Sequence, residues 1–164
     1  MIIKEIINRR SVRDYKKESV PEDNILELIK AAQFAPSARN NHAIEFIVVR
    51  EKKIKDRISI LGGQEFVKKA PVLIIPVVNP ANTPCPNQDL AVAAQNILLQ
   101  ATALGLGAVW KAVKREWMDG VKDLIGVPAN YLLDTIIPVG YPNETKTAHT
   151  DAEFNKNKIH YEKW

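Results

Sequence analysis

Apolar residues recur along this chain with two different periods, which predict helices and strands respectively. Spacing of three and four residues, as in Ile25, Leu28 and Ala32, places side chains on one face of a helix. Alternation, as in Ile44 and Phe46, and short continuous apolar runs are typical of strands. On this basis we expect helices over 3–10, 19–34, 54–62, 89–104 and 115–125, and strands over 43–50, 70–78, 107–113 and 132–139.

Capping residues, glycines and prolines predict where several of these elements begin and end. Ser19, with a proline two residues on and Glu22 at the third position, is typical of a capping box at a helix start. The glycines at 62 and 63 should end one helix, and Gly105 should close the longest one in the left-handed conformation. Pro76 weakens the prediction of its strand, because proline has no N–H for the ladder.

Four strands and five helices predict a three-layer sandwich of the α/β or α+β class, with helices on both faces of a sheet. Residues 1–142 form the expected domain, and residues 143–164 form a C-terminal arm without any periodic pattern. The arm holds Phe154, Ile159, Tyr161 and Trp164, so it is too apolar to extend freely into water. It should therefore lie across a surface, either of its own domain or of a second subunit.

Length and composition suit one globular domain and exclude several protein classes. The chain has 164 residues, of which 46% are hydrophobic and 26% charged, close to average globular usage. Apolar stretches of about ten residues are too short to span a bilayer, and the first five residues lack the layout of a signal peptide. Cys85 is the single cysteine, which excludes an internal disulfide and a cysteine-rich zinc site. We therefore expect a cytoplasmic protein with no membrane partner.

Positive charge is concentrated at the N-terminus. The first 17 residues hold six cationic and two acidic side chains, and so carry the whole net charge of +4. The cluster is compact and interrupted by Ser11, whereas a nucleic-acid binder usually presents a broad basic stripe. It suits one small anion, such as a phosphate monoester, better than nucleic acid. A solvated basic helix end is the alternative interpretation.

The sequence lacks the usual motifs of protein-based catalysis. It contains no GxxxxGK[ST] loop, no GxGxxG and no GxSxG elbow. His42, His149 and His160 lie far apart, without the spacing of metal ligands. We therefore predict neither a catalytic side chain nor a metal site. If the protein is an enzyme, a cofactor should supply the chemistry.

Three segments could together hold a phosphorylated aromatic cofactor. The arginines of residues 9–13 can grip phosphate oxygens in bidentate fashion. Residues 35–42 supply small side chains that permit close approach to a flat ring, and amides for its polar edges. Residues 105–112 run from a helix end into a strand, where backbone N–H groups could face a ring nitrogen.

In order and spacing, these segments resemble the FMN-dependent nitroreductase family. The resemblance rests on RRSVR at 9–13, APSARN at 35–40, LGLG-x-x-W at 104–110 and PVGYP at 138–142, and it covers essentially the whole chain. The closing KIHYEKW is similar to the C-terminus of short family members. The resemblance implies an α+β three-layer sandwich with a mainly antiparallel sheet. It also implies a homodimer with FMN at the subunit interface and a C-terminal arm exchanged between subunits.

The resemblance also implies roles for particular residues. One subunit would hold the FMN phosphate, ribityl chain and pyrimidine edge through Arg9, Arg10, Ser11 and Arg13. The other subunit would cover the ring with Pro36, Ser37, Ala38 and Asn40. The backbone of Lys111 and Ala112 would approach the N5 side of the flavin, and Gln64 would lie near its pyrimidine edge. Lys146 would complete the phosphate site, with His149 as the alternative.

Three positions depart from the family pattern, and one of them is Ala112, which stands where a glycine is common. His42 replaces a glutamine that usually reaches the flavin or the substrate pocket; it could donate a hydrogen bond there or be satisfied by the loop backbone. Lys111 stands where an aliphatic residue is common, and its charge could select an anionic substrate or point to solvent.

The implied activity is ping-pong hydride transfer from NADH or NADPH to a small acceptor such as a nitroaromatic, quinone or enone. A flavin sensor or carrier without a dedicated substrate is the second hypothesis, and a small basic nucleic-acid binder is the third. We expect no nucleic-acid partner. The first two hypotheses predict a yellow protein and the third a colourless one.

Overall fold

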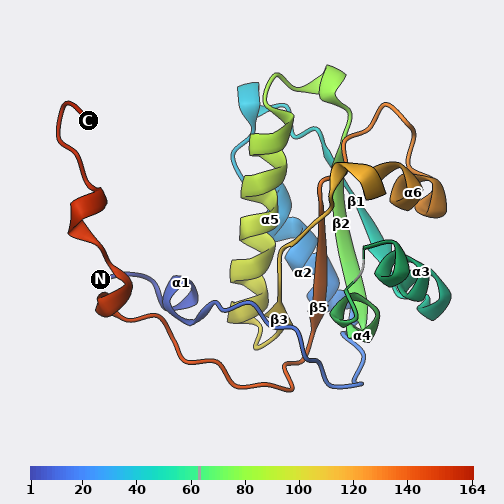
Figure 1. Cartoon of the computed structure of the whole chain (residues 1–164), viewed down its shortest axis with the longest axis horizontal. Coiled ribbons are helices and arrows are strands. Elements are labelled where there is room, and N and C mark those ends of the chain that lie inside the picture. The colour runs from blue at the N-terminus through green and yellow to red at the C-terminus, as the bar shows by residue number, and fades with distance from the viewer. Residues whose placement is uncertain (63) are drawn as a thin grey trace.

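An antiparallel sheet with helices on both faces forms the body of the protein, in a computed structural model that describes residues 1–62 and 64–164 (Figure 1). The helices are α1 (Lys4–Asn8), α2 (Glu22–Gln33), α3 (Lys52–Gly62), α4 (Phe66–Lys69), α5 (Pro86–Ala103) and α6 (Arg115–Ile125). The strands are β1 (Ile44–Val49), β2 (Val72–Val78), β3 (Gly107–Ala108), β4 (Lys111–Ala112) and β5 (Thr135–Gly140). Short 3₁₀ turns lie at η1 (Ala38–Asn40), η2 (Pro80–Asn82), η3 (Asp151–Glu153) and η4 (Lys156–Lys158).

The sheet has the order β1-β2-β5-β3, with β4 also paired to β5, and every named pair is antiparallel. All seven residues of the central strand β2 are buried. Val78 exchanges backbone hydrogen bonds with Leu132, so its N–H points to the edge of β2 that faces Leu132. The nitrogen of Pro76, two residues earlier, points to the same edge of β2. The β2–β5 ladder ends at Ile74 opposite Ile137, before it reaches Pro76. The strand therefore accommodates the proline without losing a ladder donor.

Two hydrophobic cores, one on each face of the sheet, make the three layers. Ile74 packs with the buried faces of α2 and α5, whereas Leu73 and Ile75 pack with α3, α4 and α6. Figure 1 shows α2 and α5 on one side of the sheet and α3, α4 and α6 on the other. The period of two in β2 sends successive apolar side chains to opposite cores. The predicted α+β three-layer sandwich with a mainly antiparallel sheet is therefore confirmed.

The predicted strand over 107–113 is wrong, because it forms two short strands, β3 and β4. Pro138 of β5 is the residue opposite the break and has no N–H to donate. Val109 donates its own N–H to the Pro138 carbonyl at 3.3 Å, but no return bond is possible. The partner strand thus interrupts a run that is continuous in the sequence.

Several predicted ends also need correction. The helix expected from Ser19 begins at Glu22, and Ser19 makes no cap because Pro21 occupies the N-cap position. The long helix begins at Pro86 rather than at 89, since proline is well tolerated in a first turn. The last strand spans Thr135–Gly140. The four-residue helix α4 was not predicted.

Two glycine predictions have different outcomes. Gly105 has φ +69°, which confirms the left-handed end of α5. Helix α3 ends at Gly62, while Gly63, the second residue of the predicted stop, lies outside the described residues. In the part of the chain that the structure describes, no helix is long and apolar enough to cross a membrane.

The C-terminal arm first returns along the N-terminal segment of the same chain. Asn143 donates its N–H to the Asp14 carbonyl at 3.0 Å, and His149 donates its N–H to the Ile7 carbonyl at 2.9 Å. Beyond His149 every residue is exposed, and the arm projects away from the body beside α1 (Figure 1). Phe154 and Trp164 are therefore exposed and lie outside both hydrophobic cores of the described residues.

Candidate functional site

The arginine segment, residues 9–13, is fixed to the sheet by β3. Ser11 bridges to Ala108, and Val12 donates its N–H to the Ala108 carbonyl at 3.1 Å. Val12 is buried against Gly107, where a Cβ atom would lie 2.6 Å from the Val12 Cγ1 atom. Glycine at 107 therefore permits this close approach, which sets the position of the arginines next to β3.

Four predicted site residues line one hollow of about 280 Å³, which we call the cationic hollow. They come from three parts of the chain: Arg13 from the arginine segment, Gln64 from the turn before α4, and Lys111 and Ala112 from β4. The other lining residues are Phe66, Trp110, Lys114 and Trp117. Pairing of β4 with β5 holds Lys111 and Ala112 against α6, which contributes Trp117.

Lys111 lies at the base of the cationic hollow and is only 6% exposed. Its ammonium donates to the Ala112 carbonyl at 2.6 Å and lies 4.8 Å from the centroid of the Trp117 ring. The Lys114 ammonium lies 4.7 Å from the same ring. Burial lowers the pKa of Lys111 below its usual value, and the neighbouring Lys114 charge lowers it further. The side chain therefore does not point freely into solvent.

The arm residues 143–149 run beside the arginine segment. The Arg10 guanidinium donates to the Thr147 carbonyl at 2.5 Å, and the Arg9 guanidinium lies 3.3 Å from His149 Nε2. His149 Nδ1 lies 2.7 Å from a Glu153 carboxylate oxygen. Arg9, Arg10 and His149 thus lie in one cluster beside the arm, and the Glu153 carboxylate is part of the same cluster.

Lys146, the other candidate for the phosphate site, is held by Glu144. Its ammonium lies 2.6 Å from Glu144 Oε2, while Oε1 of the same carboxylate accepts the Arg13 N–H at 2.6 Å. The Arg13 N–H and the Lys146 ammonium together lower the pKa of Glu144 below its usual value. Both candidates therefore contact a carboxylate, and His149 also contacts a predicted phosphate ligand, Arg9.

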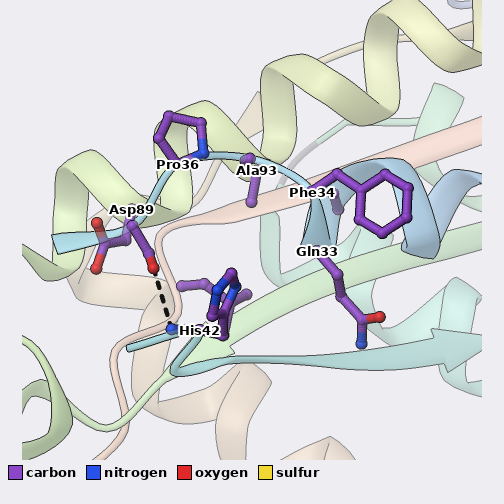
Figure 2. A pocket seen from close by; sticks show the side chains of 10 residues that line it. Gln33, Phe34, Pro36, His42, Asp89 and Ala93 are labelled. Carbon is purple, nitrogen blue, oxygen red and sulfur yellow. Dashed lines mark hydrogen bonds between the residues drawn. The ribbon is translucent and has the colours of Figure 1, made fainter. Parts of the chain in front are cut away.

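The remaining predicted residues gather in a different place, the proline–serine loop of residues 36–42. Figure 2 shows Pro36 and His42 around a cavity of about 320 Å³, next to Asp89 and Ala93 of α5. The His42 N–H donates to Ser37 Oγ at 3.0 Å, drawn as the dashed line in Figure 2. The His42 ring in turn lies 2.9 Å from Asn40 Oδ1. The loop partners thus satisfy part of the hydrogen-bonding capacity of His42.

The same loop holds three non-glycine residues in the left-handed region. Arg39, Asn40 and His42 have φ values of 55°, 56° and 48°. Such conformations are uncommon outside glycine and persist only where the surrounding structure enforces them. The loop is therefore held in one defined shape.

Asp89 is the residue that holds this loop, and the sequence analysis did not identify it. Its Oδ1 atom accepts the Ala38 N–H at 2.9 Å, and its Oδ2 atom accepts the Thr83 hydroxyl at 2.6 Å. The residue is 4% exposed. The one available signal is a lone acid in the first turn of an otherwise uncharged helix. Asp89 connects three segments: the proline–serine loop, the proline-rich loop at 79–87 and α5.

The two groups of predicted residues lie at opposite ends of α5. The proline–serine loop bonds to Asp89 in its first turn, whereas the arginine segment pairs with Ala108, just beyond its last turn. Its 18 residues at 1.5 Å each make α5 about 27 Å long. Figure 1 shows the same separation, with η1 at one end of α5 and β3 at the other. One chain therefore does not bring both groups to the same ring.

Comparison with known proteins places this geometry in a family. The Nitroreductase family model matches residues 6–61 and 59–141. A protein of Archaeoglobus fulgidus with the provisional name NADH dehydrogenase/NAD(P)H nitroreductase is 35% identical, with 99% of this chain and 98% of that protein covered. A protein of Methanothermobacter thermautotrophicus with the same provisional name is 37% identical, with 99% of this chain and 87% of that protein covered.

A solved structure agrees with these matches. The FMN-dependent nitroreductase of Clostridium difficile R20291 superposes with a TM-score of 0.94 at 32% identity, covering 99% of this chain and all of that one. The shared architecture therefore extends over both groups of site residues and the C-terminal arm. The chain belongs to the Nitroreductase family.

Proposed function

We propose that this protein is an FMN-dependent oxidoreductase that uses NADH or NADPH to reduce a small organic acceptor. The observation that carries the proposal is the convergence of Arg13, Gln64, Lys111 and Ala112 on one hollow beside the arginine segment. The names of the relatives support the same activity: NAD(P)H nitroreductase for the relative from Archaeoglobus fulgidus, and FMN-dependent nitroreductase for the solved structure.

The residues of this region fit a flavin phosphate in chemistry. Arg9 and Arg10 offer planar, permanently charged donors for the phosphate, and His149 adds an imidazole beside Arg9. Aromatic side chains form much of the hollow wall, which suits a flat ring. Among the described residues that line the hollow, none carries a carboxylate that would repel an anionic ring edge.

The chain's own residues would bind and orient the cofactor and hold charge beside it. FMN, when bound, would supply the redox chemistry, which is hydride transfer from NAD(P)H and two-electron reduction of the acceptor. The Arg13 guanidinium would stabilise negative charge at the ring edge. Ala112, whose carbonyl accepts a hydrogen bond from the Lys111 ammonium, also lines the hollow, and its backbone would help to fix the ring position. No side-chain acid or base is needed for hydride transfer itself.

The overall reaction balances for each acceptor class. A quinone takes up two electrons and two protons to become a hydroquinone. A nitro group takes up two electrons and two protons, and loses one oxygen atom as water to leave a nitroso group. NAD(P)H supplies both electrons and one proton, as hydride, and water supplies the other proton. We propose a ping-pong order, in which NAD(P)⁺ leaves the open face of the site before the acceptor enters.

We further propose that the working unit is a homodimer in which each site takes residues from both chains. The separation of the arginine segment and the proline–serine loop along α5 supports this, since one chain does not join them. The exposed Phe154, Tyr161 and Trp164 support a C-terminal arm that lies on the partner rather than on its own domain. In the dimer, Pro36, Ser37, Ala38, Asn40 and His42 of one chain would cover the ring held by the other.

An absorbance spectrum of the purified, FMN-loaded protein tests the cofactor. Flavin bands at one FMN per subunit would support the proposal, and a colourless protein after loading would refute it. Anaerobic addition of NADH or NADPH then separates an enzyme from a flavin carrier: rapid bleaching is expected, and slow or absent bleaching would refute the enzyme.

Sedimentation velocity tests the dimer. A chain truncated after Pro142 should sediment as a monomer if the arm is exchanged, whereas the full chain should sediment as a dimer. A stable dimer of the truncated chain would refute the exchanged arm.

A further inference from the structure

The cationic hollow carries more positive charge than an uncharged aromatic ring requires. Arg13, Lys111 and Lys114 all line it, and the described lining residues include no carboxylate. Two of the ammonium groups lie within 4.8 Å of the centroid of the same Trp117 ring. A ligand in this hollow therefore meets three cations and an aromatic wall together.

The Lys111 charge has no anionic counterpart among the described residues. Of the three N–H groups on its ammonium, one donates to the Ala112 carbonyl. Across residues 1–62 and 64–164, no carboxylate forms an ion pair with it. A buried cation without a partner costs free energy, and an anion placed within reach recovers part of that cost. Free donors and uncompensated charge thus favour a negatively charged ligand.

Lys114 adds a second, accessible charge at the mouth of the hollow. Its side chain is 65% exposed, and its ion pair with Glu116 is long, at 3.8 Å. Exposed pairs of this kind contribute little stability, so the Lys114 ammonium can turn to an incoming anion at small cost. Lys111 at the base and Lys114 at the mouth therefore define a path of positive charge.

The cofactor phosphate does not account for these two lysines. Arg9 and Arg10 lie at the outer edge of the arginine segment beside the arm, and neither lines the hollow. The phosphate thus has its own group of cations. Lys111 and Lys114 are left for a different anionic group on the molecule that shares the hollow with the ring.

We propose that the cationic hollow selects aromatic acceptors that carry a carboxylate, with Lys111 and Lys114 as the specificity-determining residues. This inference rests on the proposed function, because it concerns which acceptor enters beside the bound FMN. The carboxylate would accept hydrogen bonds from the free donors of the Lys111 and Lys114 ammonium groups. A neutral acceptor of the same size would leave those donors unpaired.

Binding of benzoate and benzamide to the oxidised, FMN-loaded protein tests the selection. The two probes share ring and size and differ in charge, and each Kd can be measured from the perturbation of the flavin absorbance at fixed ionic strength. We expect benzoate to bind at least about tenfold more tightly, as for a charge-assisted hydrogen bond. Raising the salt concentration should reduce the difference, because the mouth of the hollow is exposed.

Three variants show whether the lysines cause the preference. Lys111→Met and Lys114→Met should each reduce the benzoate-to-benzamide preference several-fold. Lys52→Met removes an equal charge from the exposed first turn of α3 and should leave it unchanged. If Lys111→Met fails to fold, Lys114→Met still tests the proposal, since its side chain is exposed.

The same comparison on turnover uses 4-nitrobenzoate and 4-nitrobenzamide, and the ratio of their kcat/KM values should fall in both lysine variants. Equal Kd values for the two probes, or an unchanged ratio in both variants, would overturn the proposal. If the lysine substitutions changed only the preference between NADPH and NADH, the proposal would also be overturned, because the two lysines would then recognise the electron donor and not the acceptor. A colourless protein would instead refute the proposed function, which the flavin spectrum shows separately.

Discussion

Asp89→Ala is the substitution that best tests how the proline–serine loop is held. In the folded protein the Asp89 carboxylate accepts the Ala38 N–H at 2.9 Å and the Thr83 hydroxyl at 2.6 Å, at 4% exposure. If the carboxylate served only the α5 dipole, its removal would cost about 0.5 kcal/mol. If it holds two loops, both donors lose a charged acceptor, and the Ala38 N–H loses its partner.

The magnitude follows from these two bonds. Each hydrogen bond to a charged group contributes about 1.5 kcal/mol, and the relief of carboxylate desolvation offsets part of the sum. We therefore expect a loss of roughly 2–3 kcal/mol in the free energy of unfolding, which lowers the Tm by about 5–10 °C for a chain of this size. Urea and thermal unfolding at pH 7 measure both quantities.

Glu116→Ala is the matched control, because Glu116 is also an acid in a first helical turn but is exposed. Glu116→Ala should lower the free energy of unfolding only by the interaction of the acid with the helix dipole, about 0.5 kcal/mol. A double-mutant cycle of Asp89→Ala with Thr83→Val should give a coupling energy of about 1 kcal/mol or more. A loss for Asp89→Ala no larger than that of Glu116→Ala, together with zero coupling to Thr83, would refute the reasoning.

The remaining predictions concern the arginine segment and one buried acid. Arg10→Ala should weaken FMN binding by roughly 1.5–3 kcal/mol, the value of one charged hydrogen bond, and unchanged flavin occupancy after dialysis would contradict it. Gly107→Ala should cost about 1–3 kcal/mol of stability, because the added Cβ lies 2.6 Å from Val12; Gly120→Ala, whose Cβ meets only Leu61 at 3.5 Å, should cost little. Burial raises the pKa of Asp134 above its usual 3.8, so its contribution to stability is lost as the pH rises through that raised value. Asp134→Asn should therefore raise the Tm at pH 7 and flatten the dependence of the Tm on pH above 3.8, and an unchanged profile would contradict the assignment.

Most of the fold could be predicted because local apolar patterns determine it. The run from Val72 to Val78 is apolar on both faces, and the structure places it at the centre of the sheet between two cores. The break between β3 and β4 could not be predicted from its own residues, because its cause is Pro138 on the partner strand. Helix α4 is too short to show a period.

The candidate site was predictable to a different extent in its two halves. The resemblance gave the residue types, and the structure brings Arg13, Gln64, Lys111 and Ala112 together in one hollow. The role of Asp89 was missed because its partners, Ala38 and Thr83, are separated from it in the sequence and contact it only in the fold. The homodimer, the arm exchange, the roles of the site residues and the cytoplasmic location stay predictions.

The position of Asp89 also explains why a long helix suits a site shared between two chains. Helix α5 has the proline–serine loop bonded to its first turn, and the arginine segment paired just beyond its last turn. A rigid helix therefore fixes the distance between the arginine segment, which we propose to hold the phosphate, and the proline–serine loop, which we propose to cover the ring. Two chains related by a two-fold axis would bring the opposite ends of their α5 helices together and form two equivalent sites. On this argument Asp89→Ala should weaken FMN binding as well as folding, although Asp89 lies at the far end of α5 from the arginine segment of its own chain.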